Sequence, residues 1–484
     1  IVALWWSFWQ RTSTSEQFMA AGRSLPGWAV GLSVFGSYIS SISFLANPGK
    51  AFADNWNPAV FALAMPLAAW IAARWFVPFY RQAGEVSAYQ HLEHRFGPWA
   101  RTYAVVCFLL VQLARLGTIL YLLALALSPL LGVNIPAIIV VVGIVVTIYP
   151  LLGGTEAWIW AGVIQAVVLV LGAAICLGAL LLGMPGGPVE TARLAAAEGK
   201  FSLGSFGPNL AESTFWVVLV YGFVTHLQNF GIDQSYVQRY ITADSDQAAR
   251  RSVWLGTWLF MPVSVVFFLI GTALWAFYQG HPDRLPTGLD ATARPDAVFP
   301  HFIATELPPG LTGLVIAAIC AAAMDSNLNC CATLVLCDLY RRYFRPQASE
   351  RESLWVLRLS TLAMGALGTG AGLAMLSARS ALDVWWQLAG ILSGGILGLF
   401  LLGLISPRVR SGAALAGVAA GVVLILWMTF SPSPTLWPWP ILRSPFHGLL
   451  TLVFGTVTVL LVGLVGGLFT TTRIAPPDID GPKP

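Results

Sequence analysis

A series of apolar segments, each close to the length of a membrane crossing, constrains this chain more than any other feature. A helix needs roughly 20 mostly apolar residues to cross the hydrocarbon core of a bilayer. Only 10% of the residues are charged, against roughly 25% in a soluble domain. The sequence therefore predicts an all-α polytopic membrane protein that forms a single domain, 1–484, in the lipid bilayer. Spans are predicted at residues 26–46, 57–78, 101–131, 135–152, 157–183, 213–232, 252–278, 310–338, 355–377, 382–406, 411–430 and 446–471.

The two ends of the chain do not form complete spans. Residues 1–9 are apolar but too short to cross, and we interpret them as a truncated first helix, which makes about 13 transmembrane helices. Residues 472–484 are expected to form a disordered tail.

Basic residues predict the orientation, because Lys and Arg near helix ends are retained on the cytoplasmic side. Most of them, including Arg239 in a VQRY run and the pair Arg250-Arg251, fall in segments that are cytoplasmic if the N-terminus is outside. We interpret the VQRY run and this pair as topology anchors. The expected location is the cell inner (plasma) membrane, with the C-terminus cytoplasmic. A net charge of only +4 argues against a nucleic-acid partner.

The first predicted span is interrupted by small polar residues at mid-membrane depth. They are Gly36, Ser37, Ser40, Ser41 and Ser43. One interpretation is close helix packing through small residues. The other is a discontinuous helix whose carbonyls and hydroxyls hold an ion and a solute, as in secondary transporters.

A second interruption, THLQNFGIDQS at residues 225–235, opens a second set of helices and matches the position of the first interruption in its own set. We predict two inverted repeats at 26–183 and 213–406, each opening with a broken helix, followed by two additional helices within 411–471. Matching interruptions in two halves indicate the solute site. Gln228 and its polar neighbours either meet solute hydroxyls or cap the broken helix.

Four stretches resemble the sodium/solute symporter family: FMAAGRSLPGWAVGLSVF, VSAYQHLEHRFGPWAR, IDQSYVQRYITADSDQAARR and LAGILSGGILGLFLLGLISPR. Within it, GRSLPGWAVGLSVFGSYISSISF is similar to the bacterial sialic acid symporters. The resemblance implies a LeuT-type 5+5 inverted-repeat fold. It also implies alternating access and sodium-driven import of a small polar organic solute, such as sialic acid or another sugar.

Arg115 is the charged residue that most needs an explanation, because it lies inside an apolar segment. A charge there costs about 2.5–3.5 kcal/mol on insertion scales. An internal ion pair or snorkelling is one interpretation, and a guanidinium fork for a substrate carboxylate is the other. The resemblance implies the second.

The resemblance also implies a solute pocket around Arg115. It assigns Ser40, Ser41 and Ser43 to this pocket, and an amide-bearing position of the relatives corresponds to Ala62 here. Tyr38 either flanks the solute or fills the core. Trp385 and Trp386 are interpreted foremost as an interfacial aromatic belt.

The resemblance further implies a sodium site, formed by the carbonyls of Gly36 and Ile39 and by residues in the stretch AAICAAAMDSNLNCC. Hydroxyls and carbonyls suit a hard cation. One alignment of that stretch places the carbonyl of Ala322 and the side chains of Asp325 and Ser326 at the site. The other places Ala322 and Ala323 at the hydroxyl positions. The family's second sodium-associated aspartate corresponds to Gly162.

Asp325 itself has three interpretations: a cation ligand, a structural ion pair or helix-end contact, and a proton carrier. Gly162 and the stretch AAICAAAMDSNLNCC, which is about three residues shorter than the family pattern, indicate a proton-coupled or uncoupled carrier of the same fold as one alternative. A membrane sensor is an alternative of another class, although the tail offers no signalling domain. An enzyme is not expected, because neither an HExxH cluster nor a nucleophile elbow is present. We expect a monomer that binds sodium and no organic cofactor.

Overall fold

The computed structural model describes residues 14–40, 42–84, 86–285, 294–323, 327–377, 380–434 and 437–469, without the side chains of residues 149, 152–154, 157, 322 and 323. The predicted first-helix stub (1–9) and tail (472–484) lie outside this part of the chain. In the described part, secondary structure is helical apart from one isolated parallel bridge, Leu25 to Ala243.

The described helices fall into two halves of the chain. In the first half they are α2 (Ser15–Ala20), η1 (Ala21–Arg23), α3 (Gly27–Tyr38), η2 (Ile42–Ala46), α4 (Asn47–Ala53), η3 (Asn57–Ala59), α5 (Val60–Leu63), α6 (Met65–Ile71), η4 (Ala72–Phe76), α7 (Val77–Ala83), α8 (Gln90–Phe96), α9 (Pro98–Leu131), α10 (Ile135–Gly183) and α11 (Gly187–Ala197). In the second half they are α12 (Phe215–Ile232), α13 (Gln234–Thr242), α14 (Asp246–Gly280), η5 (Pro282–Arg284), η6 (Pro295–Ala297), α15 (Val298–Thr305), α16 (Pro309–Ala323), α17 (Leu328–Leu334), η7 (Val335–Phe344), α18 (Glu350–Ala374), η8 (Met375–Ser377), α19 (Ala381–Leu392), α20 (Ile396–Ile405), α21 (Ser411–Phe430), η9 (Pro440–Leu442) and α22 (Leu450–Leu468).

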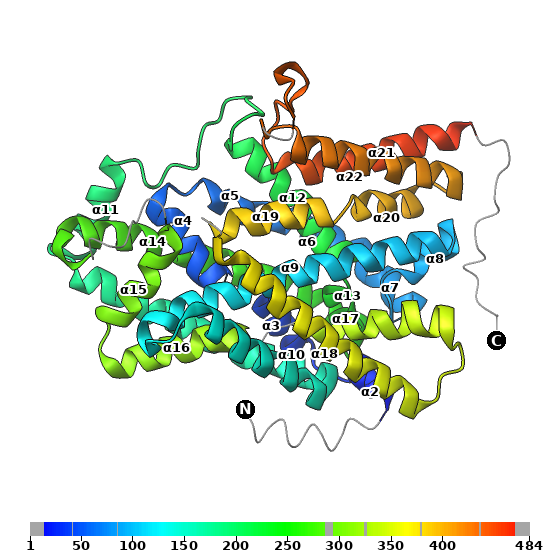
Figure 1. Ribbon diagram of the computed structural model, residues 1–484, viewed down its shortest axis with the longest axis horizontal. Coiled ribbons are helices and arrows are strands. Elements are labelled where there is room, and N and C mark those ends of the chain that lie inside the picture. Colours follow the sequence, from blue (N-terminus) through cyan, green and yellow to red (C-terminus); the bar gives the residue numbers. More distant parts are fainter. Residues whose placement is uncertain are drawn as a thin grey trace.

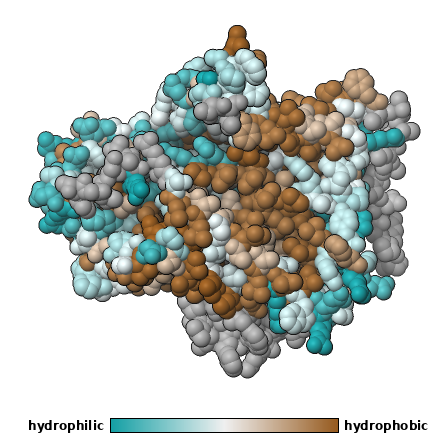
Figure 2. Space-filling model, in the orientation of Figure 1, coloured by the Kyte–Doolittle hydropathy of each residue, from teal (hydrophilic) through white to brown (hydrophobic). Residues whose placement is uncertain are grey.

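Several of these helices have the length and apolar character of a membrane crossing. In the described part of the chain, 8 single helices are long and apolar enough to cross a membrane. In addition, 2 pairs of consecutive helices reach this length and apolar character when the two bent halves are taken as one span. The long helices run roughly side by side in Figure 1. In the same view, Figure 2 shows a broad apolar band between two more polar ends. This pattern confirms the predicted polytopic membrane protein.

Both predicted interruptions are real breaks. α3 ends at Tyr38, helix resumes at Ile42, and the two halves meet at a bend of 51°. Farther along the chain, Asp233 is extended between α12 and α13. α3 packs against α14 and α10, so the first break lies inside the bundle rather than against lipid.

Two predicted spans have different boundaries in the structure. The helix α10 runs without interruption through residues 153–154, where we predicted an end, and its 49 residues are enough for about two crossings. The predicted span 382–406 is instead the pair α19 and α20, bent by 44°. Gly394 and Gly395 both have positive φ at this bend, which glycine adopts without strain.

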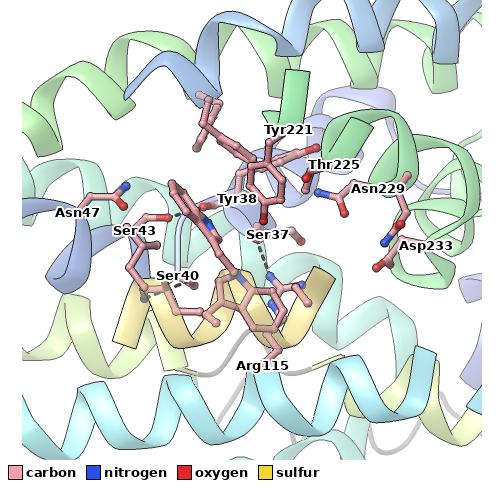
Figure 3. Close-up of a pocket in the computed structure, with 18 of the residues that line it drawn as sticks. Ser37, Tyr38, Ser40, Ser43, Asn47, Arg115, Tyr221, Thr225, Asn229 and Asp233 are labelled. Atoms are coloured by element: carbon pink, nitrogen blue, oxygen red, sulfur yellow. Dashed lines mark hydrogen bonds between the residues drawn. The ribbon is translucent and has the colours of Figure 1, made fainter. Parts of the chain in front are cut away.

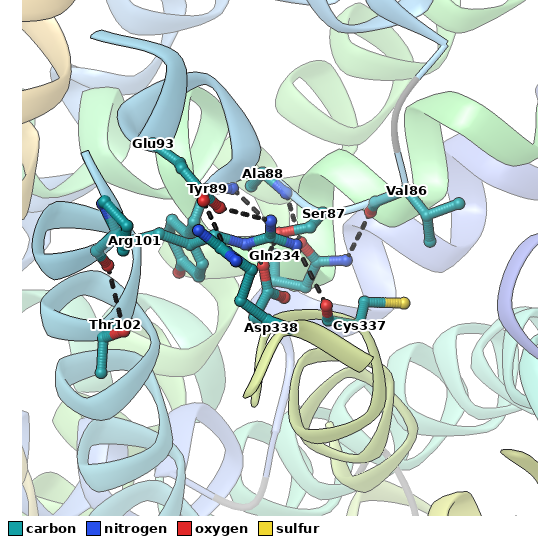
Figure 4. Close-up of polar contacts among 12 residues, drawn as sticks. Val86, Ser87, Ala88, Tyr89, Glu93, Arg101, Thr102, Gln234, Cys337 and Asp338 are labelled. Atoms are coloured by element: carbon teal, nitrogen blue, oxygen red, sulfur yellow. Dashed lines mark hydrogen bonds and ion pairs between the residues drawn. The ribbon is translucent and has the colours of Figure 1, made fainter. Parts of the chain in front are cut away.

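A buried polar cluster joins several helices near the end of the bundle that carries α8 (Figure 4). Asp338 of η7 pairs with Arg101 of α9 and accepts a hydrogen bond of 2.7 Å from Ser87 Oγ. Arg101 Nη1 also donates to Glu93 Oε2 at 2.8 Å. Gln234 of α13 binds the backbone on either side of Ser87. The cluster therefore ties α8, α9, α13 and η7 together.

Candidate functional site

A central cavity of about 140 Å³ lies where the two broken helices face α9 and α19. Figure 3 shows side chains from these elements surrounding it. The sequence-predicted residues Tyr38, Ser40, Ser43, Arg115 and Gln228 all line this cavity. Ser41 lies outside the described residues. The five predicted residues that the structure brings together here are up to 190 positions apart in the chain. The remaining lining residues are Ser37, Ile42, Asn47, Pro58, Phe61, Val111, Gln112, Tyr221, Thr225, Asn229, Asp233, Tyr236, Phe260, Ser264, Phe268, Leu382, Trp385, Trp386, Ala389 and Leu452.

Arg115 reaches from α9 to the end of the first half-helix. Its Nη2 donates to the carbonyl oxygen of Ser37 at 2.7 Å. The last carbonyls of a helix carry partial negative charge and lack partners within the helix. The guanidinium therefore stabilises the C-terminal end of α3 while it lines the cavity. Because a guanidinium has five N–H donors, it can serve a carbonyl and a carboxylate together.

The serine hydroxyls of the break satisfy its backbone. Ser43 Oγ donates to the Tyr38 carbonyl at 2.7 Å, and Ser40 Oγ accepts from the Ile42 amide at 3.3 Å. Ile39 is extended, with φ −100° and ψ 94°. Broken helices at membrane depth need such partners, because backbone groups cannot bind water there. These serines therefore have a structural role at the edge of the cavity.

Tyr38 forms part of the cavity wall and is also packed in the core, with only 8% of its surface exposed. Its ring lies among four others at centroid distances of 5.0 to 5.9 Å, from Phe260, Tyr236, His226 and Phe230. The position of Tyr38 is therefore compatible with both interpretations, a residue that fills the core and a residue that flanks the solute.

The second break divides its polar residues between two places. Gln228 and Asn229 line the cavity. Asp233 also lines it, but its Oδ1 caps α13 by accepting from the Ser235 amide at 2.8 Å. Gln234 instead belongs to the buried polar cluster of Arg101 and Asp338. At this break, Asp233 caps a helix, and Gln228 and Asn229 line the cavity beside it.

Aromatic side chains close the cavity on the side of α19. The favoured interpretation of Trp385 and Trp386 as an interfacial belt is wrong, because both line the cavity. Trp386 stacks on Phe61 at 5.8 Å and lies 5.5 Å from Tyr221. Sequence reasoning missed Phe61 and Tyr221. Nothing in their local sequence separates them from the many other aromatic residues, and only the packing of α5, α12 and α19 joins them.

Comparison with known proteins decides the family. The sequence profile of the sodium:solute symporter family matches residues 18–421. The chain belongs to this family. It is therefore a multi-pass membrane transporter, not an enzyme, and sodium is its coupling ion.

Individual relatives match over most of their length. The sodium/sialic acid symporter NanT of Aliivibrio fischeri is 31% identical over 490 residues, which cover 99% of this chain and 93% of the relative. The human sodium-coupled monocarboxylate transporter 1 is 32% identical over 429 residues, covering 86% and 68%. A solved substrate-bound, outward-open Na⁺-coupled sialic acid symporter superposes with a TM-score of 0.88 at 29% identity, covering 98% of this chain and 96% of that one. This likeness confirms the predicted LeuT-type all-α fold.

The residues predicted as sodium ligands lie only partly within the described residues. The Gly36 carbonyl accepts from the Ile39 amide at 3.1 Å, and the Ile39 carbonyl accepts from Gln165 Nε2 at 3.1 Å. Both carbonyls lie at the break. Ala322 is in the last turn of α16. Asp325 and Ser326 lie outside the described residues.

Gly162 lies where α10 closely approaches α3. A Cβ atom at Gly36 would be 2.9 Å from the Gly162 carbonyl oxygen, and one at Gly162 would be 3.0 Å from Ser33 Oγ.

The Ser33 hydroxyl accepts a hydrogen bond from Arg239 Nε at 3.0 Å. Arg239 is fully buried and its guanidinium lies 3.7 Å from the Trp158 ring centroid. The interpretation of Arg239 as a cytoplasmic anchor is therefore wrong, since it packs inside the bundle.

Proposed function

We propose that this symporter imports an organic acid together with sodium and that Arg115 binds the carboxylate of the solute. The observation that carries the proposal is the position of the Arg115 guanidinium, which lines a cavity inside the bundle, at the end of a broken helix. Charged residues at membrane depth that face a cavity are usually functional. The relatives that transport sialic acid and monocarboxylates both carry acidic solutes, as their names state.

We propose that sodium binds beside the first break. The carbonyls of Gly36 and Ile39 supply hard oxygen ligands there, as sodium requires. The Gln165 amide holds the Ile39 carbonyl in place. Ala322, Asp325 and Ser326 would complete the site from the second repeat. Sodium and solute would then stabilise the same conformation, which is the thermodynamic requirement for coupling.

The solute would reach this cavity from the end of the bundle that carries α11. A larger cavity of about 560 Å³ includes Asp54, Gly204 and His447 and shares Pro58 and Trp386 with the central one. At the end that carries α8, the cluster of Arg101 and Asp338 joins the helices. We propose that the α11 end faces outward in the inner (plasma) membrane, with the N-terminus outside and the chain a monomer. Alternating access would use inverted repeats at 26–183 and 213–406.

The test is uptake into proteoliposomes that contain the purified chain. Labelled organic acids and their uncharged amides are offered with a sodium, potassium or pH gradient. We expect sodium-driven uptake of acids but not of amides, a lower rate for Arg115→Lys, and no uptake for Arg115→Gln. Arg74→Gln is the matched control, because Arg74 lies in η4 and does not line the cavity.

Three results would contradict parts of the proposal. Equal uptake of an acid and its amide would remove the carboxylate assignment. Uptake driven by the pH gradient alone would favour a proton-coupled carrier. Undiminished sodium-driven uptake by Asp325→Ala would remove Asp325 from the sodium site.

A further inference from the structure

The helix α14 has an exposed face that changes in character along its length. Arg251, Trp258 and Val265 recur at every second turn, so they lie on one side of the helix. All three are exposed, Trp258 by 59% and Val265 by 42%. Trp254 belongs to the same face, because its ring stacks on that of Trp258 with centroids 6.1 Å apart. From its first turns onward, the face therefore passes from a cation through two indole rings to an aliphatic side chain.

Other residues of α14 pack inside the bundle. A Cβ atom at Gly256 would lie 2.7 Å from Val34 Cγ1, so α14 closely approaches α3. Phe260 and Ser264 of α14 line the central cavity. A molecule bound on the exposed face would therefore contact a helix that forms part of the cavity wall.

The exposed face begins at the level where lipid headgroups meet hydrocarbon. The carboxylate of Asp246, the first residue of α14, accepts a hydrogen bond of 2.5 Å from Arg81 of α7. Figure 1 shows α7 and α8 at the same end of the bundle. From there α14 continues as one of the helices that are long and apolar enough to cross a membrane. Tryptophan is enriched at such a boundary, because its ring is apolar and its N–H is polar.

Two neighbouring arginines at this level have no protein partner. Arg250 and Arg251 are both exposed, and neither forms a hydrogen bond or ion pair with any described residue. The acid one turn earlier, Asp246, is held by Arg81 instead. Guanidinium groups bind phosphate through two parallel hydrogen bonds. The start of the face therefore offers two free guanidinium groups to a phosphate.

The start of α18 provides a comparison within the same molecule. Arg351 and Trp355 are exposed there and lie one turn apart. However, Glu350 and Glu352 flank Arg351 in the chain, and Arg345 Nε lies 3.9 Å from Glu352 Oε1. Carboxylates repel a phosphate, so a similar pattern of arginine and tryptophan lacks the uncompensated charge of α14.

We propose that the exposed face of α14 binds one anionic phospholipid, and phosphatidylglycerol represents this class. Arg250 and Arg251 bind the phosphate of the headgroup. The rings of Trp254 and Trp258 pack against the glycerol backbone and the first carbons of the acyl chains, and Val265 contacts a chain deeper in the membrane. This lipid site is separate from the solute cavity and from the proposed sodium ligands.

The first experiment uses the unaltered chain in detergent micelles. Binding of palmitoyl-oleoyl phosphatidylglycerol is measured by native mass spectrometry, and phosphatidylcholine with the same acyl chains is the zwitterionic comparison. We expect phosphatidylglycerol to bind at least tenfold more tightly, and glycerol phosphate not to displace it. Equal affinity for the two lipids would overturn the role of the charge. Displacement by glycerol phosphate would show a site for a soluble anion and overturn the assignment to a lipid.

A double variant tests the two arginines. Arg250→Gln combined with Arg251→Gln should weaken phosphatidylglycerol binding about 25-fold, since one basic residue near an anionic surface contributes about fivefold. Arg345→Gln combined with Arg351→Gln is the matched control, because it removes two positive charges at the start of α18. The control should stay within twofold of the unaltered chain. Equal weakening of both would show general attraction by the basic end of the bundle and overturn the site.

Two further measurements locate the lipid. Trp258→Ala should weaken phosphatidylglycerol binding at least threefold, whereas Trp355→Ala, on α18, should not. A phosphatidylglycerol with a photoreactive diazirine in one acyl chain should crosslink to α14 in the unaltered chain and much less in the Arg250 and Arg251 double variant. Thermal unfolding without added lipid checks that each variant is folded. Crosslinks of equal yield in the folded double variant would place the lipid elsewhere and overturn the proposal.

Discussion

Arg115 Nη2 lies 2.7 Å from the carbonyl oxygen of Ser37, so a single side chain of α9 binds the C-terminal end of α3 and also lines the central cavity. The positive charge at the C-terminus of a half-helix is favourable without any solute. This contact explains how a charge inside an apolar segment can be stable while its side chain lines the cavity. This contact is with a backbone carbonyl rather than with a carboxylate, and the binding of a solute carboxylate by Arg115 stays a proposal.

Ligand binding should stabilise the protein through Arg115. A ligand present at 100 times its Kd raises the unfolding free energy by about 2.7 kcal/mol. We expect the bound organic acid to raise the thermal unfolding temperature of the unaltered chain but not of Arg115→Gln. The measurement is a thermal unfolding scan in detergent with sodium present. An equal rise in both proteins would show that the acid binds elsewhere.

Ser43→Ala should destabilise the first break. The change removes the donor that lies 2.7 Å from the Tyr38 carbonyl and leaves that carbonyl without this partner. We expect a loss of about 1 kcal/mol, with Ser43→Thr close to the unaltered protein. The unfolding free energy is measured by SDS titration in detergent micelles. The control is Ser377→Ala, because Ser377 is exposed. Stability equal to that of the control would mean that the break does not depend on this hydroxyl.

Asp338→Asn should be among the most destabilising single changes. It removes a fully buried negative charge that pairs with Arg101, whose side chain is only 9% exposed. Loss of one partner of a buried pair typically costs about 3–5 kcal/mol. The same SDS titration measures it, with exposed Asp244→Asn as the control.

A double variant tests whether the pair is needed as a pair. Arg101→Met combined with Asp338→Leu removes both charges and should cost less than Asp338→Asn alone. If the double variant is less stable than Asp338→Asn, the ion pair itself contributes more to the packing of these helices than apolar side chains can replace.

Asp296, in the short helix η6 outside the membrane spans, should make stability depend on pH. Burial raises its pKa to about 6 from the ordinary 3.8, although its Oδ2 accepts from the Ala381 amide at 2.8 Å. The folded protein therefore keeps a proton that the unfolded chain loses earlier. The unfolding free energy should fall as pH rises from about 4 to about 6, by up to about 3 kcal/mol, and should then level off.

The matching variant is Asp296→Asn, which keeps an oxygen acceptor for Ala381 but does not titrate. It should flatten the pH dependence between pH 4 and pH 6 in thermal unfolding scans. Exposed Asp283→Asn should leave the slope unchanged. A slope that survives in Asp296→Asn would assign the dependence to other groups.

The breaks between α3 and η2 and between α12 and α13 could be predicted because their causes are local. Serines and glycine in an apolar run, or an aspartate before a helix start, weaken helix continuity wherever the chain places them. The bend between α19 and α20 was not predicted, although it has a glycine pair. The uninterrupted α10 shows the opposite case, because glycines at 153 and 154 did not end the helix.

The sequence by itself determined the class of protein, its two broken helices and the importance of Arg115, because hydrophobic length, helix-breaking residues and a charge in an apolar run act over a few turns. Only the tertiary structure decided which residues share the cavity. Phe61, Tyr221 and Trp386 meet there, whereas Arg239 is buried against Trp158. Such contacts join helices far apart in the chain, so their geometry follows from the packing of the whole bundle.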